Sequence, residues 1–290
     1  MFGSIYWDPN PVLFTIPWLH WPILWYSVLF ALGFVVGFPL FVSIAMRYYL
    51  FRQHPSNLQE LRAKIVLLAD RLTLYLILAT IIGARIGHYL FYEKPSDYLN
   101  HIGEIFQIWK GGLASHGAAL AIVIALVIFV RRYKDQFQSL SVIRLLDFLS
   151  IPAALAAALI RIGNFFNQEI LGTKTQVPWA VIFGHPADRS APFARHPVQL
   201  YESFFYFCVF LLLWRLSYHP KILLRKGKLI GLFLILVFGF RMVAEYWKVE
   251  QSLLLPKHFF LTMGQMLSIP AIIAGTVLFF WHRVRDQIKR

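Results

Sequence analysis

The sequence predicts an all-α membrane protein, a polytopic bundle of about seven transmembrane helices, from its composition, its long apolar stretches and the placement of its basic residues. Of its 290 residues, 58% are hydrophobic and only 14% are charged, and the mean hydropathy is +0.60. An average soluble domain is about a quarter charged, so this chain lacks the polar residues to cover a water-facing surface. The same composition excludes a disordered chain, and the single cysteine, Cys208, excludes a disulfide-stapled secreted domain.

Seven stretches are long and apolar enough to cross a membrane as helices, which takes about 20 residues each. They are residues 18–45, 65–92, 113–130, 145–163, 200–216, 229–247 and 260–281. The second and fourth carry more polar residues than the others. No basic residue precedes the first apolar run, so we expect the first helix to be retained and not cleaved as a signal peptide.

The basic residues predict the orientation of these helices. Lysine and arginine total 28 against 14 acidic residues, a formal net charge of +14. Most of them lie in one set of alternate loops, around residues 47–64, 131–144 and 215–228, and in the tail after residue 282. Such loops face the cytoplasm and anionic lipid, so we expect no nucleic-acid partner. The amino terminus is then outside and the carboxyl terminus cytoplasmic, which requires an odd number of helices.

We expect one integral membrane domain over residues 1–290. The longest outside segment, about 164–199, contains four prolines and two glycines. This pattern predicts an external folded loop or cap between the fourth and fifth helices, not a further span.

Three arginines lie well inside the predicted helices, toward their outer ends: Arg85, Arg161 and Arg241. An arginine at the centre of a membrane helix costs about 2.5–3.5 kcal/mol on insertion scales, so each is expected to have a partner or to bind an anion. Arg71 is different, because it lies within two turns of the cytoplasmic end of the second helix and is expected to snorkel to the surface.

Polar residues accompany each buried arginine at helical spacing. They are His88 after Arg85, Asn164 and Asn167 after Arg161, and Glu245 after Arg241. One interpretation is internal ion pairing, with Arg241 and Glu245 as a buried strut. The other is an anion site, favoured by three arginines near the outer leaflet. Because a guanidinium group binds phosphate in a bidentate way, the expected ligand is a phospholipid headgroup.

A glycine-rich segment, WKGGLASHGAAL, places His116 among Gly111, Gly112 and Gly117 at the outer mouth of the third helix. Histidine is suited to proton transfer near neutral pH, although a histidine beside glycines is also a common helix-end feature. The ten histidines include no HExxH pattern and there is no cysteine pair, so no metal site is expected.

Two further patterns concern helix packing and helix ends. Gly83 and Gly87 form a GxxxG that permits close packing of the second helix. In ARHPVQLYES, Pro197 is suited to the first turn of the fifth helix and Glu202 lies just inside it. Simple capping and a functional role for this segment both remain open.

Taken together, these motifs resemble those of the prolipoprotein diacylglyceryl transferase family, over nearly the whole chain and in the same order. The matching segments are LWYS with Tyr26, GARIG with Arg85, GGLASHG with His116, RIGNFFNQEILG from Arg161 to Gly172, RHPVQLYE from Arg195 to Glu202, FGFR with Arg241 followed by Glu245, and MGQMLSIP with Gln265 and Ser268. RIGNFFNQE is the most specific of them. The chain departs from the family pattern at Ile160 and Ala118, where glycine is usual, and at Val237, where tyrosine is frequent.

The resemblance implies a multi-pass enzyme of the bacterial plasma (inner) membrane. Its substrates would be phosphatidylglycerol and prolipoprotein signal peptides with a lipobox cysteine. The diacylglyceryl group would move to the cysteine thiol, forming a thioether and releasing glycerol phosphate, with no cofactor or metal. The alternatives are a phospholipid or anion transporter or flippase, another lipid-modifying enzyme such as an acyltransferase, and a non-catalytic membrane scaffold. The oligomeric state is not indicated.

Under this reading the expected catalytic residues are His116, Arg161 and Arg241. The two arginines would stabilise the charge that grows on the phosphate, and His116 would take the thiol proton or order the headgroup. The residues expected to bind phosphatidylglycerol are Tyr26, Arg85, Arg161, Asn164, Asn167, Glu169, Gly172 and Arg241. Glu202 and Glu245 are expected to orient arginines, and Cys208 to serve only in packing.

Overall fold

The computed structural model describes residues 4–53, 55–92, 103, 114–137, 140–250 and 260–288, without the side chains of residues 91–92, 115–116 and 282–288. The described chain is mostly helical. Its helices are α1 (Trp25–Gln53), α2 (Leu58–Tyr92), α4 (Ser115–Tyr133), α5 (Val142–Phe166), α6 (Val198–Leu216), α7 (Pro220–Leu223), α8 (Lys228–Ala244), the 3-10 helix η3 (Glu245–Trp247) and α9 (Met263–Ile288). Its strands are β1 (Ile5–Trp7), β2 (Val12–Ile16), β3 (Trp21–Leu24), β4 (Val181–Phe183) and β5 (Ala194–Arg195).

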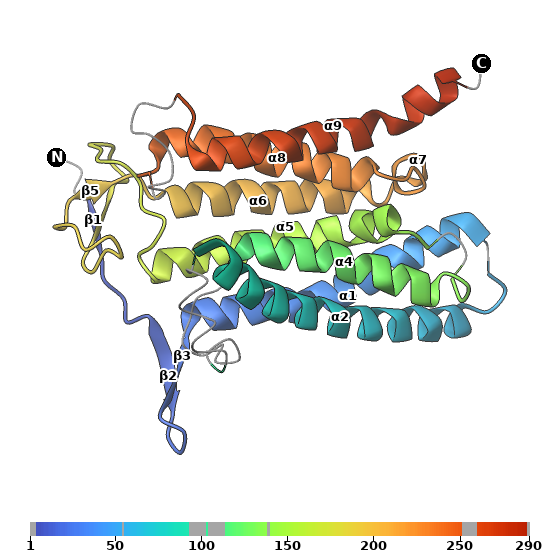
Figure 1. Ribbon diagram of the computed structural model, residues 1–290, viewed down its shortest axis with the longest axis horizontal. Helices are drawn as coiled ribbons and strands as arrows, with labels where there is room; N and C mark the ends of the chain where they lie inside the picture. Colours follow the sequence, from blue (N-terminus) through green and yellow to red (C-terminus); the bar gives the residue numbers. More distant parts are fainter. Residues whose placement is uncertain are drawn as a thin grey trace. The chain divides into compact units, whose positions relative to one another are not determined.

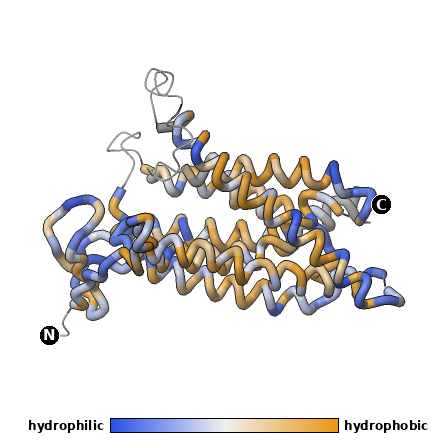
Figure 2. Tube along the Cα trace, turned by 90° about the horizontal axis from the view of Figure 1, so that it is seen from below, coloured by the Kyte–Doolittle hydropathy of each residue, from blue (hydrophilic) through white to orange (hydrophobic). Residues whose placement is uncertain are grey.

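Several helices of the described chain suit a membrane. Five are long and apolar enough to cross one: α1, α2, α5, α8 with η3, and α9. The other two predicted spans fall on α4 and α6, of 19 residues each. Large apolar side chains lie exposed on the helices, among them Leu74, Phe204 and Ile273. The helices are accordingly apolar along their lengths and polar at their ends (Figure 2). The chain is therefore a multi-pass membrane protein.

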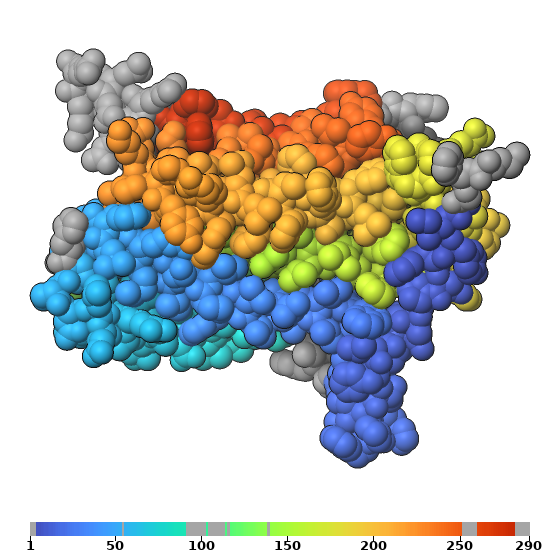
Figure 3. All heavy atoms as spheres, turned by 180° about the vertical axis from the view of Figure 1, so that it is seen from behind, coloured from blue at the N-terminus to red at the C-terminus, as the bar shows by residue number. Residues whose placement is uncertain are grey.

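The predicted start of the first helix was wrong. Residues 18–24 do not continue α1 but form a turn and strand β3, and α1 begins only at Trp25. Pro22 explains the difference, because proline disfavours the α region for the residue before it. His20 takes a left-handed φ of 47° and turns the chain between β2 and β3. The resulting hairpin stands clear of α5 and α6 (Figures 1 and 3).

The described chain divides into two compact units, residues 1–54 with 147–290 and residues 55–146. In the larger unit, α1, α5, α6, α8 and α9 lie side by side in that order (Figure 1). Small residues bring neighbours close: a Cβ on Gly33 of α1 would lie 2.9 Å from the Ala156 Cβ of α5. Aromatic rings fill other contacts, such as Phe205 and Phe240 stacked at 4.1 Å between α6 and α8.

The smaller unit contains α2 and α4, which meet through glycines. A Cβ on Gly117 of α4 would lie 2.2 Å from the Gly83 carbonyl oxygen and 2.6 Å from the Gly87 Cα. No larger residue fits there without separating the helices. The close packing predicted from the GxxxG spacing of α2 is therefore confirmed, with α4 as the partner.

A buried carboxylate fixes the start of α8. Asp147 of α5 is 0% exposed, and it accepts hydrogen bonds from three backbone N–H groups, those of Gly227 at 2.7 Å and of Leu229 and Ile230 at 3.1 Å. Gly227 has a left-handed φ of 86°, which turns its N–H toward the carboxylate. The carboxylate also complements the positive end of the α8 dipole. Asp147 thus ties α5 to α8.

We expect Asp147→Asn to lower the stability of the protein by about 1–3 kcal/mol, because the neutral amide leaves a buried N–H group without its acceptor. The loss would appear as a lower midpoint of thermal unfolding in detergent. Asp135→Asn removes the same charge at an exposed position and is the matched control. Equal midpoints for the two variants would contradict this role for Asp147.

Candidate active site

One end of the larger unit carries a small three-stranded sheet. Its order is β1-β4-β5, with β1 parallel to β4 and β4 antiparallel to β5. Phe165, Leu171, Val181 and Phe183 form a buried cluster beneath it. The Trp7 indole packs against this cluster and donates to the Phe165 carbonyl at 3.1 Å. The sheet therefore holds the chain that leaves α5, which is the segment with the RIGNFFNQE signature.

The signature folds into a chain of side-chain hydrogen bonds. Arg161 Nη1 donates to Asn164 Oδ1 at 3.2 Å. The amides of Asn164 and Asn167 both donate to Glu169 Oε1, at 2.8 and 3.2 Å. Gln168, beside Glu169, takes a left-handed φ of 52°. Such a conformation costs about 1–3 kcal/mol and persists only where surrounding contacts determine it. The residues predicted as one stripe after Arg161 thus meet around a single carboxylate.

Gly172 ends this segment in a position that only glycine fits. A Cβ there would lie 2.1 Å from the His196 carbonyl oxygen. The close approach allows backbone pairing with the chain after η3: Thr173 N–H donates to the Trp247 carbonyl at 2.7 Å, and Val249 N–H donates to the Leu171 carbonyl at 3.0 Å. This pairing places Lys248 next to the signature.

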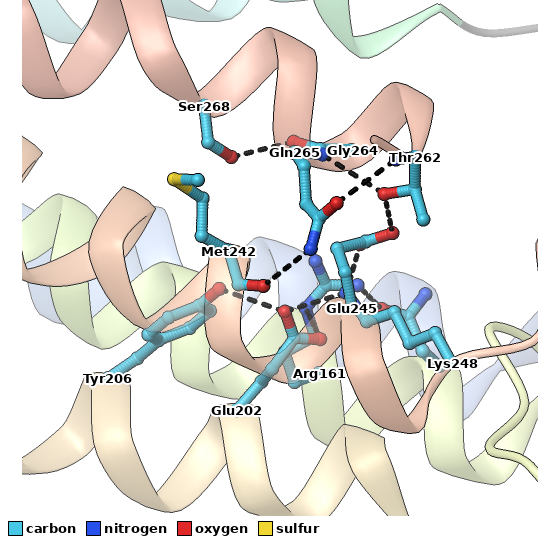
Figure 4. Close-up of polar contacts among 11 residues, drawn as sticks. Arg161, Glu202, Tyr206, Met242, Glu245, Lys248, Thr262, Gly264, Gln265 and Ser268 are labelled. Atoms are coloured by element: carbon cyan, nitrogen blue, oxygen red, sulfur yellow. Dashed lines mark hydrogen bonds and ion pairs between the residues drawn. The ribbon is translucent and has the colours of Figure 1, made fainter. Parts of the chain in front are cut away.

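The centre of the site is an ionic cluster around Glu202 (Figure 4). Glu202 lies on α6 and is 0% exposed. Its Oε2 lies 3.0 Å from Arg161 Nε, and its Oε1 accepts from Lys248 Nζ at 2.9 Å and from the Tyr206 hydroxyl at 3.1 Å. Lys248 Nζ also lies 3.0 Å from Glu245 Oε1. Two carboxylates thus compensate two cations.

The cluster continues into α9. Thr262, just before that helix, donates its hydroxyl to Glu245 Oε2 at 3.0 Å. Gln265 donates through Nε2 to the Met242 carbonyl of α8 at 3.3 Å. A Cβ on Gly264 would lie 2.4 Å from the Glu245 carboxylate, so glycine lets α9 pass the cluster without displacing that side chain. Elements α5, α6, η3 and α9 therefore contribute side chains to one network (Figure 4).

Arg241 has no acidic partner in the described part of the chain. Of the two interpretations given to this arginine, the strut between Arg241 and Glu245 is not formed, because Glu245 pairs with Lys248. Glu245 does follow Arg241 at α-helical spacing, since its backbone N–H donates to the Arg241 carbonyl. Among the described residues, three buried side-chain polar atoms have no hydrogen bond: Arg241 Nε, Gln199 Oε1 and Glu202 Oε2, whose contact with Arg161 is an ion pair only. Unsatisfied buried polar atoms are rare and commonly mark a place for a ligand or water.

The other predicted site residues are placed as follows. Tyr26 lies in the first turn of α1 and packs on Gly163, where a Cβ would come within 2.8 Å of the ring. Arg85 lies in the smaller unit, is 5% exposed, and donates to the Tyr89 hydroxyl at 3.0 Å. The His116 side chain, Gly111 and Gly112 lie outside the described residues. In the described chain, no group of three or more His, Cys, Asp and Glu could hold a metal ion.

Two members of the cluster were missed by the sequence analysis. Lys248 directly follows the predicted span 229–247, and Tyr206 lies inside the predicted span 200–216. A signal existed for Lys248, because it follows Glu245 by three residues. No such signal existed for Tyr206. It follows Glu202 by four residues, but apolar residues of the same helix occur at similar spacings.

Comparison with known sequences points to one family. The family model described as prolipoprotein diacylglyceryl transferase matches residues 11–281. Among similar proteins, one from Protochlamydia amoebophila is 34% identical, covering 98% of this chain and 96% of the relative. One from Tolumonas auensis is 38% identical, covering 94% and 96%, and one from Chloroherpeton thalassium is 38% identical, covering 99% and 97%. All three are named phosphatidylglycerol--prolipoprotein diacylglyceryl transferase.

A polar contact beside the three-stranded sheet tethers the signature to the amino-terminal segment. Asp8 Oδ1 lies 2.7 Å from His185 Nδ1 and accepts from Gln168 Nε2 at 3.1 Å. Gln168 Oε1 in turn accepts from the His185 backbone N–H at 2.7 Å. The hydrogen bonds from His185 and Gln168 hold the pKa of Asp8 below its ordinary value of 3.8. Ionised Asp8 therefore helps to hold the left-handed turn at Gln168.

This lowered pKa predicts an acid dependence of stability. Because folding favours the ionised form, the contribution of Asp8 is complete above the unfolded pKa of about 3.9 and is lost as the pH falls through the lower folded value. Asp8→Asn removes that contribution at every pH. We therefore expect the gap in thermal midpoint between wild type and Asp8→Asn to shrink from about pH 6 to about pH 3. A gap that does not change over this range would show that the ionised form is not favoured by the fold.

Proposed function

The chain belongs to the prolipoprotein diacylglyceryl transferase family, and from this premise we propose that it transfers the diacylglyceryl group of phosphatidylglycerol to the cysteine thiol of prolipoproteins. The products are a thioether on the protein and glycerol phosphate. The observation that carries the proposal is the match over residues 11–281. It includes the signature whose side chains join the buried cluster. Nothing in the comparisons favours a transporter.

The reaction demands stabilisation of a growing negative charge. The thiolate attacks the glyceryl carbon that bears the phosphate, so a carbon–sulfur bond forms and the carbon–oxygen bond to phosphate breaks. The oxygen and its electron pair leave with the phosphate, which changes from a diester with one charge to a monoester. Preorganised cationic donors at that phosphate lower the barrier most in a site of low dielectric constant.

Arg241 is the cation that the cluster leaves available for this phosphate. Glu202 compensates Arg161 and shares Lys248 with Glu245, whereas Arg241 has no such partner in the described chain and keeps a buried Nε without an acceptor. A phosphate would supply both the missing charge and the missing acceptor. Arg161 is the second phosphate ligand, with Glu202 fixing its position.

The remaining predicted residues form the headgroup pocket. Asn164, Asn167, Glu169 and Gly172 shape it along the signature, while Tyr26 closes it. Arg85, in the smaller unit, is either a further ligand of the headgroup or a structural cation. His116 takes the thiol proton or orders the headgroup, and these two roles remain alternatives. Glu245 acts indirectly. It pairs with Lys248, and Lys248 in turn pairs with Glu202.

The topology completes the proposal. Seven spans, α1, α2, α4, α5, α6, α8 and α9, cross the bacterial inner membrane as one domain over residues 1–290. The amino terminus is outside and the carboxyl terminus cytoplasmic, and residues 164–199 form the external cap. The site then lies near the outer leaflet, where a signal peptide with a lipobox cysteine is itself embedded.

The direct test is transfer of label by the purified protein in detergent. Phosphatidylglycerol labelled in its acyl chains is mixed with a signal peptide carrying a lipobox cysteine, and with the same peptide carrying serine. We expect label on the cysteine peptide alone, and we expect ester hydrolysis to release the labelled acyl chains while the glyceryl group stays on the sulfur through the thioether. Absence of label from folded protein would overturn the proposal, and lipid flux in vesicles without a new bond would replace it with the transporter reading.

Arg241→Lys separates a phosphate ligand from a structural cation. Lysine keeps the charge but loses the planar fork that binds two phosphate oxygens, so we expect kcat to fall at least about 100-fold. Arg225→Lys, an exposed substitution of the same kind, is the control and should leave turnover unchanged. Normal turnover by folded Arg241→Lys would refute bidentate binding of the leaving phosphate.

A further inference from the structure

A mainly apolar cavity with basic groups in its wall lies in the smaller unit, apart from the residues proposed for the transfer reaction. It is a cavity of about 230 Å³ between the first turns of α2 and the last turn of α4. Its polar lining comes from Lys64, Arg71 and Gln136, with the Tyr133 ring beside them. Leu67, Leu68 and Phe137 supply the apolar part of its wall. The cavity therefore combines basic groups with an apolar surface.

Arg71 is the charged group of this cavity that lacks a hydrogen-bond acceptor among the described residues. Its guanidinium lies 5.2 Å from the centre of the Tyr133 ring. It has no hydrogen bond or ion pair to any residue that the structure describes. Lys64 differs, because its Nζ lies 2.6 Å from Glu60 Oε1, and both side chains are largely exposed. Arg71 alone therefore presents a full set of guanidinium donors to the cavity.

The cavity lies at a membrane boundary. On α2, no charged residue follows Arg71 until Arg85, and on α4 none precedes Arg131. Arg71 and Tyr133 thus mark the polar end of two neighbouring apolar helices, which is where lipid headgroups lie. The sequence alone indicated only that Arg71 would snorkel to this surface.

The surrounding charge is mainly basic. Arg131, Arg132 and Lys134 lie exposed at the end of α4. Asp70 and Asp135, also exposed, are the acidic neighbours in sequence. Basic pockets between transmembrane helices at the cytoplasmic side are a known setting for anionic headgroups, and an arginine over an aromatic ring keeps its N–H edge free for a planar anion.

We propose that this cavity binds the phosphate group of an anionic phospholipid, with Arg71 as its principal ligand. Lys64 and Gln136 lie at the same recess, and the first acyl carbons lie against Leu67 and Phe137. This site is independent of the transfer reaction, so its failure and that of the proposed function are distinguishable. It would bind a resident lipid and not a substrate.

The test is lipid binding by the full chain in detergent, measured by native mass spectrometry with phosphatidic acid as the probe. Arg71→Gln is compared with Arg62→Gln, which removes the same charge from an exposed position of α2 outside the cavity. We expect wild type and Arg62→Gln to bind alike, and Arg71→Gln to lose one bound lipid or bind it about tenfold more weakly. Arg71→Lys, which keeps the charge without the fork, should fall between them and replaces Arg71→Gln if that variant does not fold.

Three results would overturn the proposal. The first is equal binding by Arg71→Gln and Arg62→Gln. The second is equal occupancy with phosphatidylcholine, which would show that apolar contact alone fills the cavity. The third is displacement of the lipid by millimolar inorganic phosphate in an Arg71-dependent way, which would identify the ligand as a free anion.

Discussion

The buried carboxylate of Glu202 is the constraint on which the rest of the site depends. Moving a carboxylate out of water costs several kcal/mol, and only well-placed cations with hydrogen bonds repay it. Arg161, Lys248 and the Tyr206 hydroxyl supply them. These groups come from α5, the chain after η3, and α6, so one charge requires three distant segments to meet. The left-handed turn at Gln168 and the close approach at Gly172 follow from that requirement, because they bring the signature back beside Lys248.

Carboxylates pair with Arg161 and Lys248 and leave Arg241 as the cation that the proposed function assigns to the anion. Arg241 is half-buried, keeps a buried Nε without a hydrogen bond and has no acidic partner among the described residues. An arginine so placed is costly in a membrane protein, and the packed helices and the cluster supply that free energy. Under the proposed function, its donors need not reorganise when a phosphate binds. A site in which every cation had its carboxylate would hold its shape equally well and offer little to an anion. The paired charges around Glu202 hold the site together, and the unbonded Nε of Arg241 is the part of the site that is left for an anion.

How much of the fold and of the site could be predicted depends on how far apart in the sequence the interacting residues lie. Apolar runs are local, so all seven predicted spans fall on helices, and the GxxxG of α2 correctly indicated close packing. The predicted first span began too early because it ran through Pro22, although that proline is present in the sequence. Strands of three residues, such as β1 and β4, are too short to show alternation, and their pairing joins residues some 175 positions apart. Spacing allowed an Arg241–Glu245 strut but could not show that Lys248, in the chain that follows, takes Glu245 instead. Lys248 was missed because counting loop charges assigns every loop cation to the surface.

The choice of cation at each position follows from geometry. Lys248 bridges Oε1 of Glu202 and Oε1 of Glu245, two acceptors on different elements, and a compact ammonium with three rotatable donors suits such a bridge. Arg161 instead donates through Nη1 to Asn164, while its Nε forms an ion pair with Glu202 Oε2 at 3.0 Å. These two contacts, at different ends of the planar group, orient it. The arginine fork of Arg241 is the remaining planar donor, and a tetrahedral phosphate with two oxygens on one edge is the acceptor whose shape matches it. The cluster thus uses lysine where a charge must be shared and arginine where a direction must be kept.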